Sequence, residues 1–388
     1  MKLNVKWGTS LFQDIEIDPS TTIELFKMQL YSLTDVEPER QKILYKGVRV
    51  KDDNSLSSLP PEALLHMFGT KAAVPKERKH LQKEEDSHQT SQTTLQKTSP
   101  ASLVNLGNTC YISSAIQLLF GVKDIKERIE QAETGNGVLI ELKNLFGKME
   151  SGLGTQISPV LLVSALRNAF PQFQGKNDKG FFEQQDAAEC WDALLSSLNT
   201  PGLQPDIVGS LFQGELSVSE NITEKRREPF TEILCPITTA TNTIEECLEQ
   251  ALREKHEPEK TRISSLPQYL VLKKHRFFWK KEEQVVAKIL KKIAFPLTLD
   301  VSGLCTEELR STGPEPFTLI GVLTHTGRSS SSGHYIAWVK DCAHDGLWWK
   351  MDDQTATEQK DENILGLSGG GDWHMAYMLL YRRNQPSK

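Results

Sequence analysis

The chain has 388 residues, of which 38% are hydrophobic and 25% are charged, and its net charge at pH 7 is −6. This length allows two or three domains, and the composition is typical of a globular protein in water. No apolar run approaches the roughly 18 residues of a membrane span, and the alternating N-terminus lacks the apolar segment of a signal peptide. We therefore expect no membrane partner, and the acidic net charge argues against nucleic acid.

The cysteines point to a reducing compartment. They lie at positions 110, 190, 235, 247, 305 and 342, and no two of them form a C-x-x-C pair. Without a secretory signal we expect free thiols, a cytoplasmic location with the nucleus as a second possibility, and no structural zinc. No metal and no organic cofactor is predicted.

Residues 1–70 have the pattern of a small sheet packed on one helix. Apolar and polar residues alternate over residues 3–7 and 15–17, which predicts a β-hairpin. Two further strands are predicted at residues 43–45 and 64–68. The helix between the strand pairs, which Thr21 or Thr22 can cap, has an apolar face formed by Ile23, Phe26, Leu30 and Leu33. The order ββαββ predicts a β-grasp domain.

This block also resembles ubiquitin. The segments that match, in ubiquitin's order, are Thr22-Ile23-Glu24, Glu39 to Gly47, and Leu56-Ser57. The resemblance implies a ubiquitin-like domain, and the absence of a terminal Gly-Gly indicates a fixed domain and not a tag. Leu44 stands where ubiquitin carries the isoleucine of its binding patch, so it is a candidate receptor contact or simply a half-exposed strand residue. A generic α+β domain is the alternative.

Two further blocks follow. Residues 71–100 are almost entirely polar and bury too little to offset the entropy of ordering, so we predict a flexible linker. Residues 101–384 form one large block, with helical spacing at 159–166 and 186–198 and strand-like segments at 270–272 and 376–381.

A candidate nucleophile lies near the start of the large block. A turn-forming cluster, Asn105, Gly107 and Asn108, leads into Cys110. The helical apolar pattern after it consists of Ile112, Ala115, Ile116 and Leu119. The first turn of a helix favours a thiolate, which is the nucleophilic form of cysteine. A lone cysteine before a helix is more often a small buried hydrophobic residue, so the surrounding motifs must decide.

A base and an orienting acid lie near the C-terminus. His334 stands where a Gly/Ser-rich loop enters an apolar strand, and His325 lies on the preceding strand. A histidine base needs an acceptor on its second ring nitrogen. Asp352 and Asp353 follow a strand that can pair with the His334 strand. An early Cys with a late His and Asp is the papain-like order.

The large block resembles the ubiquitin-specific proteases. The matching segments are Asn105–Tyr111, Gln184–Glu189, Leu266–Leu270 with Arg276-Phe277, Gly333–Tyr335 and Tyr377–Tyr381. The resemblance implies a deubiquitinase with a papain-like domain of fingers, palm and thumb, α+β in class. It also implies Cys110 as nucleophile, His334 as general base and acid, Asp352 as orienting carboxylate and Asn105 as oxyanion donor, with Asp353 as the alternative acid.

The resemblance also implies a substrate. Ubiquitin's tail, Arg-Leu-Arg-Gly-Gly, is basic and thin at the scissile end. Asp186 and Glu189, at i and i+3, can pair with its arginines, although Asp186 can also simply cap its helix. The segments 276–281 and 327–332 correspond to two loops that cover the tail groove, so low activity in isolation is expected. The residues assigned to substrate binding are Asp186, Glu189, Gln185, Phe277, Phe278, Ser331, Ser332, Gly333 and Tyr335.

The order of ubiquitin-like domain, linker and protease resembles one branch, the proteasome-associated ubiquitin-specific proteases. Local similarities are at residues 6–8, 276–278, 323–334 and 367–374, whereas the stretch 304–316 is shorter than in many members. The resemblance implies ubiquitinated proteins and the proteasome regulatory particle as partners of a monomeric enzyme. A ubiquitin receptor without activity and a papain-like protease for other tails are the alternatives.

Overall fold

The computed structural model describes two compact units, Met1–Thr93 and Thr94–Lys388. The described residues are 2–8, 10–16, 41–50, 63–69, single positions between 23 and 60, and 99–385 with gaps at 133–134, 178–179, 200–205, 220–224, 256–260, 281–284, 328–331 and 372. Most of the predicted linker, 71–100, lies outside the described residues. Among them, no helix has the length and apolar character needed to cross a membrane.

The N-terminal unit is a five-stranded sheet with a helical segment packed on one face. The strand order is β2-β1-β5-β3-β4, with β1 at Lys2–Trp7, β2 at Ser10–Glu16, β3 at Lys42–Tyr45, β4 at Val48–Arg49 and β5 at Leu64–Phe68. Ile23, Phe26 and Leu30 are helical and fully buried, as their spacing predicts. Leu33 lies outside the described residues. The predicted hairpin, the two later strands and the β-grasp arrangement are confirmed.

The palm of the larger unit is one extended sheet. Its strand order is β10-β12-β20-β16-β17-β18-β19, and β15 pairs with β16 beside this path. The strands are β10 (Ile233–Pro236), β12 (Tyr269–His275), β15 (Thr298–Leu299), β16 (Phe317–Thr326), β17 (His334–Lys340), β18 (Leu347–Asp352), β19 (Thr355–Lys360) and β20 (Met375–Arg383). The antiparallel run β16-β17-β18 places the ends of three strands at one edge of the sheet.

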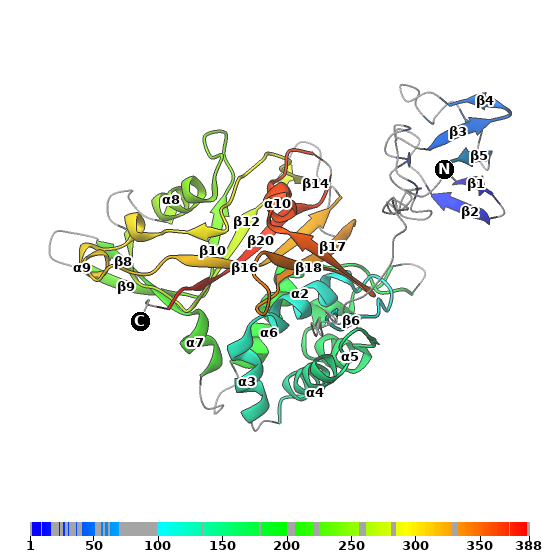
Figure 1. Cartoon of the computed structure of the whole chain (residues 1–388). Coiled ribbons are helices and arrows are strands. Elements are labelled where there is room, and N and C mark those ends of the chain that lie inside the picture. Colours follow the sequence, from blue (N-terminus) through cyan, green and yellow to red (C-terminus); the bar gives the residue numbers. More distant parts are fainter. Residues whose placement is uncertain are drawn as a thin grey trace, which may run out of the picture. The chain divides into compact units, whose positions relative to one another are not determined.

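The thumb consists of helices gathered on one side of this sheet (Figure 1). They are α2 (Cys110–Phe120), α3 (Lys123–Gln131), α4 (Gly137–Ser151), α5 (Val160–Ala169), the 3₁₀ helix η3 (Pro171–Gln174), α6 (Ala187–Leu198) and α7 (Ile207–Phe212). Two short strands, β6 (Ser102–Leu103) and β7 (Gln156–Ile157), pair in parallel. Helix α2 packs between α6 and β17. All of its residues except Phe120 are buried, as expected of a central helix.

The fingers are a three-stranded sheet of order β11-β8-β9. Its strands are β8 (Gly214–Ser219), β9 (Lys225–Phe230) and β11 (Thr261–Ser265). The remaining elements of the larger unit are α8 (Ile244–Lys255), β13 (Phe277–Lys280), β14 (Val285–Lys288), η4 (Ser302–Leu304), α9 (Glu307–Ser311), α10 (Asp361–Leu365) and η5 (Gly366–Ser368). The predicted division into fingers, palm and thumb is confirmed. The predicted helices at 159–166 and 186–198 correspond to α5 and α6.

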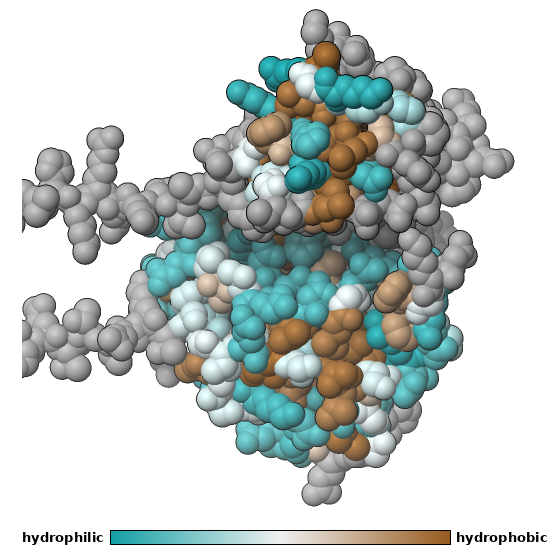
Figure 2. Space-filling model, turned by 90° about the vertical axis from the view of Figure 1, so that its right-hand side faces the viewer, coloured by the Kyte–Doolittle hydropathy of each residue, from teal (hydrophilic) through white to brown (hydrophobic). Residues whose placement is uncertain are grey.

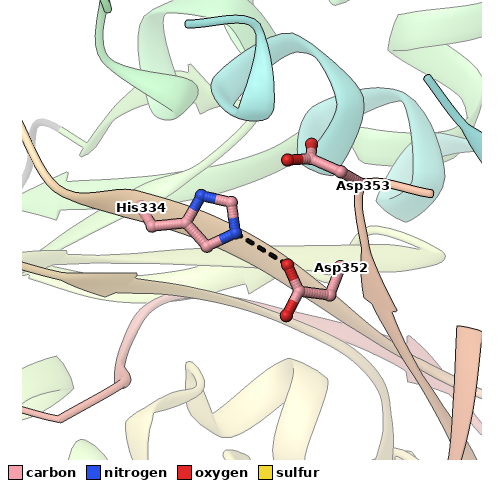
Figure 3. A group of neighbouring side chains, drawn as sticks. All are labelled: His334, Asp352 and Asp353. Atoms are coloured by element: carbon pink, nitrogen blue, oxygen red, sulfur yellow. Dashed lines mark hydrogen bonds and ion pairs between the residues drawn. The ribbon is translucent and has the colours of Figure 1, made fainter. Parts of the chain in front are cut away.

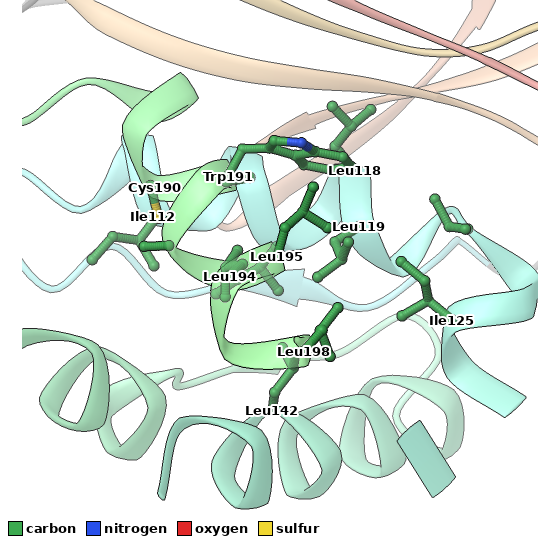
Figure 4. Close-up of a cluster of buried hydrophobic side chains, with 14 of the residues drawn as sticks. Ile112, Leu118, Leu119, Ile125, Leu142, Cys190, Trp191, Leu194, Leu195 and Leu198 are labelled. Carbon is green, nitrogen blue, oxygen red and sulfur yellow. The ribbon is translucent and has the colours of Figure 1, made fainter. Parts of the chain in front are cut away.

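The thumb and the palm share one large apolar core. Figure 4 shows Ile112, Leu118 and Leu119 of α2 facing Cys190, Trp191 and Leu194 of α6. Cys190 and Trp191 are fully buried, so the prediction that they are core residues is confirmed. Because α2 is enclosed by this core, its first residue, Cys110, has a fixed position relative to β17.

Candidate active site

The cysteine turn is held by its own side chains. Asn105 Oδ1 accepts hydrogen bonds from the Gly107 N–H at 2.8 Å and from Thr109 Oγ1 at 3.2 Å. Gly107 and Asn108 have positive φ angles of 93° and 53°, values that glycine and asparagine tolerate best. Helix α2 begins at Cys110, whose side chain is buried. The predicted cysteine at the start of a helix is confirmed.

The β-strands bring an imidazole and a carboxylate to this turn. His334 is the first residue of β17 and Asp352 is the last of β18. His334 Nε2 lies 2.7 Å from Asp352 Oδ1 (Figure 3). The Cys110 sulfur is near enough to the same imidazole to raise its pKa. The structure therefore places His334 and Asp352 in contact and Cys110 beside them, while their catalytic roles stay a prediction.

The electrostatics of the site favour a charged imidazole. Burial by itself would lower the pKa of His334, but the hydrogen bond with Asp352 and the nearby Cys110 sulfur outweigh it and raise this pKa to about 10. Burial likewise raises the pKa of Asp352, but the hydrogen bond with His334 and the nearby Lys350 ammonium bring it well below its usual range. Lys350 Nζ lies 3.0 Å from Asp352 Oδ2. An imidazolium beside a sulfur is the arrangement that stabilises a thiolate.

Asp353 has a different role from Asp352. It lies in the turn between β18 and β19 with a positive φ of 48°, and its Oδ2 accepts a hydrogen bond of 2.7 Å from Asn105 Nδ2. Its carbonyl accepts the Leu103 N–H at 3.0 Å, which ties this turn to the chain that leads into the cysteine turn. Burial raises the Asp353 pKa despite the hydrogen bond from Asn105. Asp353 therefore orients Asn105, whereas Asp352 binds the ring of His334.

Gln184 is a site residue that the sequence analysis did not assign. Its Oε1 lies 3.6 Å from Cys110 Sγ, and its side chain is buried. The residue belongs to the Gln184–Glu189 motif, so the motif contained the signal, but nothing in the local pattern shows that its first glutamine reaches the cysteine. Lys176 and Phe182, which form an antiparallel bridge, precede it, and the Phe182 carbonyl accepts a hydrogen bond from the Asn108 amide at 3.0 Å.

The acidic residues predicted to meet the substrate lie at the start of α6. Asp186 is the N-cap: it accepts the Ala188 N–H at 2.7 Å and the Tyr377 hydroxyl at 2.8 Å. Glu189 is exposed in the first turn, and Gln185 is half-buried. Burial raises the pKa of both Asp186 and Glu189. The capping alternative for Asp186 is confirmed, and pairing with a basic tail stays a prediction for these residues.

Of the remaining predicted substrate contacts, Phe277, Ser332 and Tyr335 contact His325. Phe277 packs edge-on against His325 with ring centroids 5.5 Å apart, and Tyr335 is buried with its ring centroid 4.4 Å from the same imidazole. Phe278 is 43% exposed. The predicted loop 276–281 is mostly strand β13, and Arg276 is buried at its base. Ser332 and Gly333 are exposed, and Ser331 lies outside the described residues.

The donor set at the site fits acid–base chemistry better than metal binding. One ligand atom each of His334, Asp352 and Asp353 lies within 4.8 Å of the others, which is a spacing that can hold a cation. However, Asp352 already binds His334 and Lys350, and Asp353 binds Asn105. Figure 3 shows the Asp352 carboxylate turned towards the imidazole, while Asp353 is not joined to the ring by a hydrogen bond.

Comparisons with known proteins agree with this geometry. Residues 101–381 match the model of the family described as ubiquitin carboxyl-terminal hydrolase, and residues 3–71 match the ubiquitin family. The chain is 32% identical to Ubiquitin carboxyl-terminal hydrolase 7 of Arabidopsis thaliana, with 98% of both chains covered. It is 29% identical to Ubiquitin carboxyl-terminal hydrolase 14 of Caenorhabditis elegans, with 98% of this chain and 92% of the relative covered.

A solved structure supports the fold. The chain is similar to the SAGA DUB module bound to monoubiquitin, with a TM-score of 0.58 and 22% sequence identity over 73% of this chain and 69% of that one. The matched family model covers the residues that bear the cysteine turn, His334 and Asp352. The chain is therefore a member of the ubiquitin carboxyl-terminal hydrolase family, a cysteine-type deubiquitinase that carries an N-terminal ubiquitin-like domain.

Proposed function

We propose that this deubiquitinase acts at the proteasome, where it cleaves ubiquitin from conjugates with Cys110 as nucleophile, and that its ubiquitin-like domain is the docking module. The observation that supports the assignment of the nucleophile is the Asp352–His334 hydrogen bond, with the Cys110 sulfur at the start of α2 acting on the same imidazole. The proteasome part rests on the ubiquitin-like domain and on a similarity to Ubiquitin carboxyl-terminal hydrolase 14 of Caenorhabditis elegans that covers both domains of this chain.

The proposed reaction is acyl transfer through a thioester. The Cys110 thiolate attacks the carbonyl carbon of ubiquitin's last glycine, and His334 protonates the departing lysine amine. His334 then takes a proton from water, which attacks the thioester and releases the carboxylate. Asp352 holds the imidazole through Nε2 and stabilises its positive charge.

Asn105 is the proposed oxyanion donor. One hydrogen of its side-chain amide goes to Asp353, and its oxygen accepts from the cysteine turn. These contacts fix the plane of the amide, so its second hydrogen has a defined direction. A donor held in place before the reaction stabilises the developing negative charge without the cost of reorganisation.

The tail of ubiquitin is basic, and the start of α6 is acidic. Glu189 is exposed there, and Asp192, one turn further on, forms an ion pair with Lys273. Lys273 also contacts Glu232, directly before β10, at 2.6 Å, so one buried lysine faces two carboxylates. This excess of negative charge suits the arginines of the tail, which we place along α6.

The proposed docking face is the outer face of β3 and β5 in the ubiquitin-like domain. Side chains alternate along β5, so Leu64, His66 and Phe68 are exposed while their neighbours are buried. Leu44 pairs with His66 across the two strands and is half-buried. Phe68 is 57% and Leu64 43% exposed. Figure 2 shows apolar side chains gathered on this unit next to polar ones. An exposed apolar patch on so small a domain is typical of a protein interface.

Two measurements test the proposal. Turnover of a fluorogenic ubiquitin C-terminal amide by the full chain tests the nucleophile: we expect Cys110→Ala to abolish it. Co-sedimentation with purified proteasome, and turnover in its presence, test the partner: we expect Leu44→Ala/Phe68→Ala to lose binding and any stimulation while the turnover of the free enzyme is unchanged.

The matched control is Leu11→Ala, since Leu11 is 51% exposed on β2 at the far edge of the same sheet. It should bind proteasome as the wild type does. Retained binding by the Leu44→Ala/Phe68→Ala variant would refute the docking face. A wild-type chain that cleaves the amide but ignores proteasome would refute the proteasome role and leave the deubiquitinase intact.

A further inference from the structure

A buried lysine joins two segments beside the active site. Lys288 is the last residue of β14, and only 9% of it is exposed. Its Nζ lies 2.9 Å from His325 Nδ1, 2.8 Å from the His325 carbonyl oxygen and 3.0 Å from the Gly327 carbonyl oxygen. Three acceptors match the three hydrogens of an ammonium group. A buried lysine is retained only where such partners compensate for its lost hydration.

The partners of His325 fix its tautomer. An ammonium group can only donate, so Nδ1 must accept from Lys288. A carbonyl can only accept, so the hydrogen on Nε2 goes to the Ser332 oxygen, 3.0 Å away. The imidazole is thus neutral and bridges Lys288 to the far end of the 327–333 loop. Burial, followed by the charge of Lys288, lowers the pKa of His325 to about 3, which agrees with this tautomer.

The loop that these bonds close leads directly into His334. Thr326 pairs with His334 as the last pair of the β16–β17 hairpin. Gly327 and Gly333 have φ angles of 107° and 108°, and a Cβ on Gly333 would lie 2.0 Å from the Thr326 oxygen and 2.9 Å from His325 Nε2. Positions 327 and 333, at the two ends of the loop, therefore have no room for a side chain. His325 binds the backbone of Ser332, which lies two residues before His334 in the chain.

The same lysine belongs to the hairpin that carries Phe277. Phe277 and Lys288 form the first pair of β13 and β14, and the Lys288 ammonium lies 5.8 Å from the Phe277 ring centroid. Arg276 anchors the base of this hairpin through bonds to the Ile289, Lys291, Ser368 and Ala376 carbonyls. Lys288 thus connects an anchored hairpin to the loop end at Gly327.

We propose that Lys288 and His325 form a latch that positions the two ends of the loop, at Gly327 and at Ser332–Gly333, and through them the imidazole of His334 for catalysis. Neither residue is catalytic, because neither touches Cys110; both act through Ser332 and Gly333. The latch belongs to the deubiquitinase reaction and is independent of the proteasome partner. It can therefore fail while the proposed docking role stands, and the reverse is also true.

The test compares Lys288→Met with Lys291→Met in the full chain. Lys291 lies three residues later and also donates to two carbonyl oxygens, those of Thr238 and Thr239. Within the described part of the chain it forms no hydrogen bond with the ends of the loop. We expect Lys288→Met to lower kcat for a fluorogenic ubiquitin amide by about 10²-fold, since a displacement of about 1 Å costs this much. The rate of Cys110 alkylation by iodoacetamide should fall as well, because it too depends on His334. Lys291→Met should leave both within twofold.

Variants of His325 separate positioning from folding. His325→Gln keeps one donor and one acceptor at the same reach, so we expect it to retain most of kcat, whereas His325→Leu should lose as much as Lys288→Met. The variant with both Lys288→Met and His325→Leu should be no slower than the slower single variant, since both remove one latch. A thermal melt checks that each variant is folded. Normal kcat and normal alkylation in folded Lys288→Met, or equal losses in Lys291→Met, would overturn the proposal.

Discussion

Two histidines lie on adjacent paired strands of the palm, yet their charges differ. His334 stands opposite Thr326, and His325 stands opposite Tyr335 in the same hairpin. Burial lowers the pKa of each ring, but the outcome is about 10 for His334 and about 3 for His325. A carboxylate and a sulfur face the first ring, and an ammonium faces the second. The comparison shows that the partners, more than the degree of burial, decide which histidine carries a proton.

We expect the largest effect on the difference between the two histidines when His334 loses its carboxylate partner. Asp352→Asn keeps the size of the side chain but removes the charge and can favour the wrong tautomer, so we expect kcat to fall by about 10⁴, as in other triads. The pKa of His334 should also fall, because the group that raises it is gone. The imidazolium is then lost at lower pH, so the alkaline limb of the kcat/KM profile should move towards neutral pH.

One pattern of results would contradict this prediction. Equal kcat losses in Asp352→Asn and Asp353→Asn, with the alkaline limb of the profile unmoved in the former, would show that the imidazole is not oriented by Asp352. Asp353 would then return as the candidate acid.

Asn105→Ala is the next largest change that we expect. Without the amide the oxyanion loses a donor, and kcat should fall by about 10²–10³ with little change in KM. Because Asn105 does not touch His334, the pH profile should keep its shape, which distinguishes this loss from that of Asp352→Asn. Steady-state kinetics over a pH series measure both quantities. A shifted profile in Asn105→Ala would contradict the separation.

Asp353→Asn sharpens the contrast between the two neighbouring aspartates. Its Oδ2 accepts from Asn105, so an amide here can turn its nitrogen towards the Asn105 donor and leave it without an acceptor. We expect a kcat loss that is smaller than that of Asn105→Ala, and none beyond it when the two changes are combined. The combination is measured with the same ubiquitin amide. Additive losses would show that Asp353 acts on something other than Asn105.

Much of this site could be predicted from the sequence because its motifs are local. The cysteine turn, the helix after it and the strand that begins at His334 each follow from a run of adjacent residues. The roles of Asp352 and Asp353 could not be separated in this way, because both follow the same strand. Their difference arises in the β18–β19 turn, where a positive φ at Asp353 turns its side chain to Asn105.

Other features depend on contacts between distant segments. In the sequence Lys288 has no feature that distinguishes it from other polar strand residues. Only the fold brings it to His325, 37 residues later. The same holds for Gln184, which is 74 residues from Cys110. The strand β9 has the sequence KRREPF, which lacks the alternation of a half-buried strand, so the fingers could be expected only from the family resemblance.

The smallest effect that we predict concerns the pH dependence of stability. His325 is neutral when folded down to about pH 3, whereas an unfolded histidine takes up a proton near pH 6.5. The unfolded state therefore binds more protons between these values, so His325 makes the protein less stable as the pH falls from 6.5 towards 3. His334 has the opposite sign: its contribution is complete below pH 6.5 and is lost as the pH rises towards 10.

His325→Gln keeps the two hydrogen bonds but has no proton to take up, so the decline in Tm between pH 6.5 and pH 4 should become shallower. His374, whose pKa burial also lowers to about 3, should contribute with the same sign, and the double variant with His374→Gln should be shallower still. Thermal melts of folded variants across this range give the slopes, and the absolute Tm values do not enter the comparison. A slope as steep as that of the wild type in His325→Gln would mean that this imidazole is protonated in the folded protein. Lys288 and a second cation would then face each other in one buried site, and the latch as described could not hold.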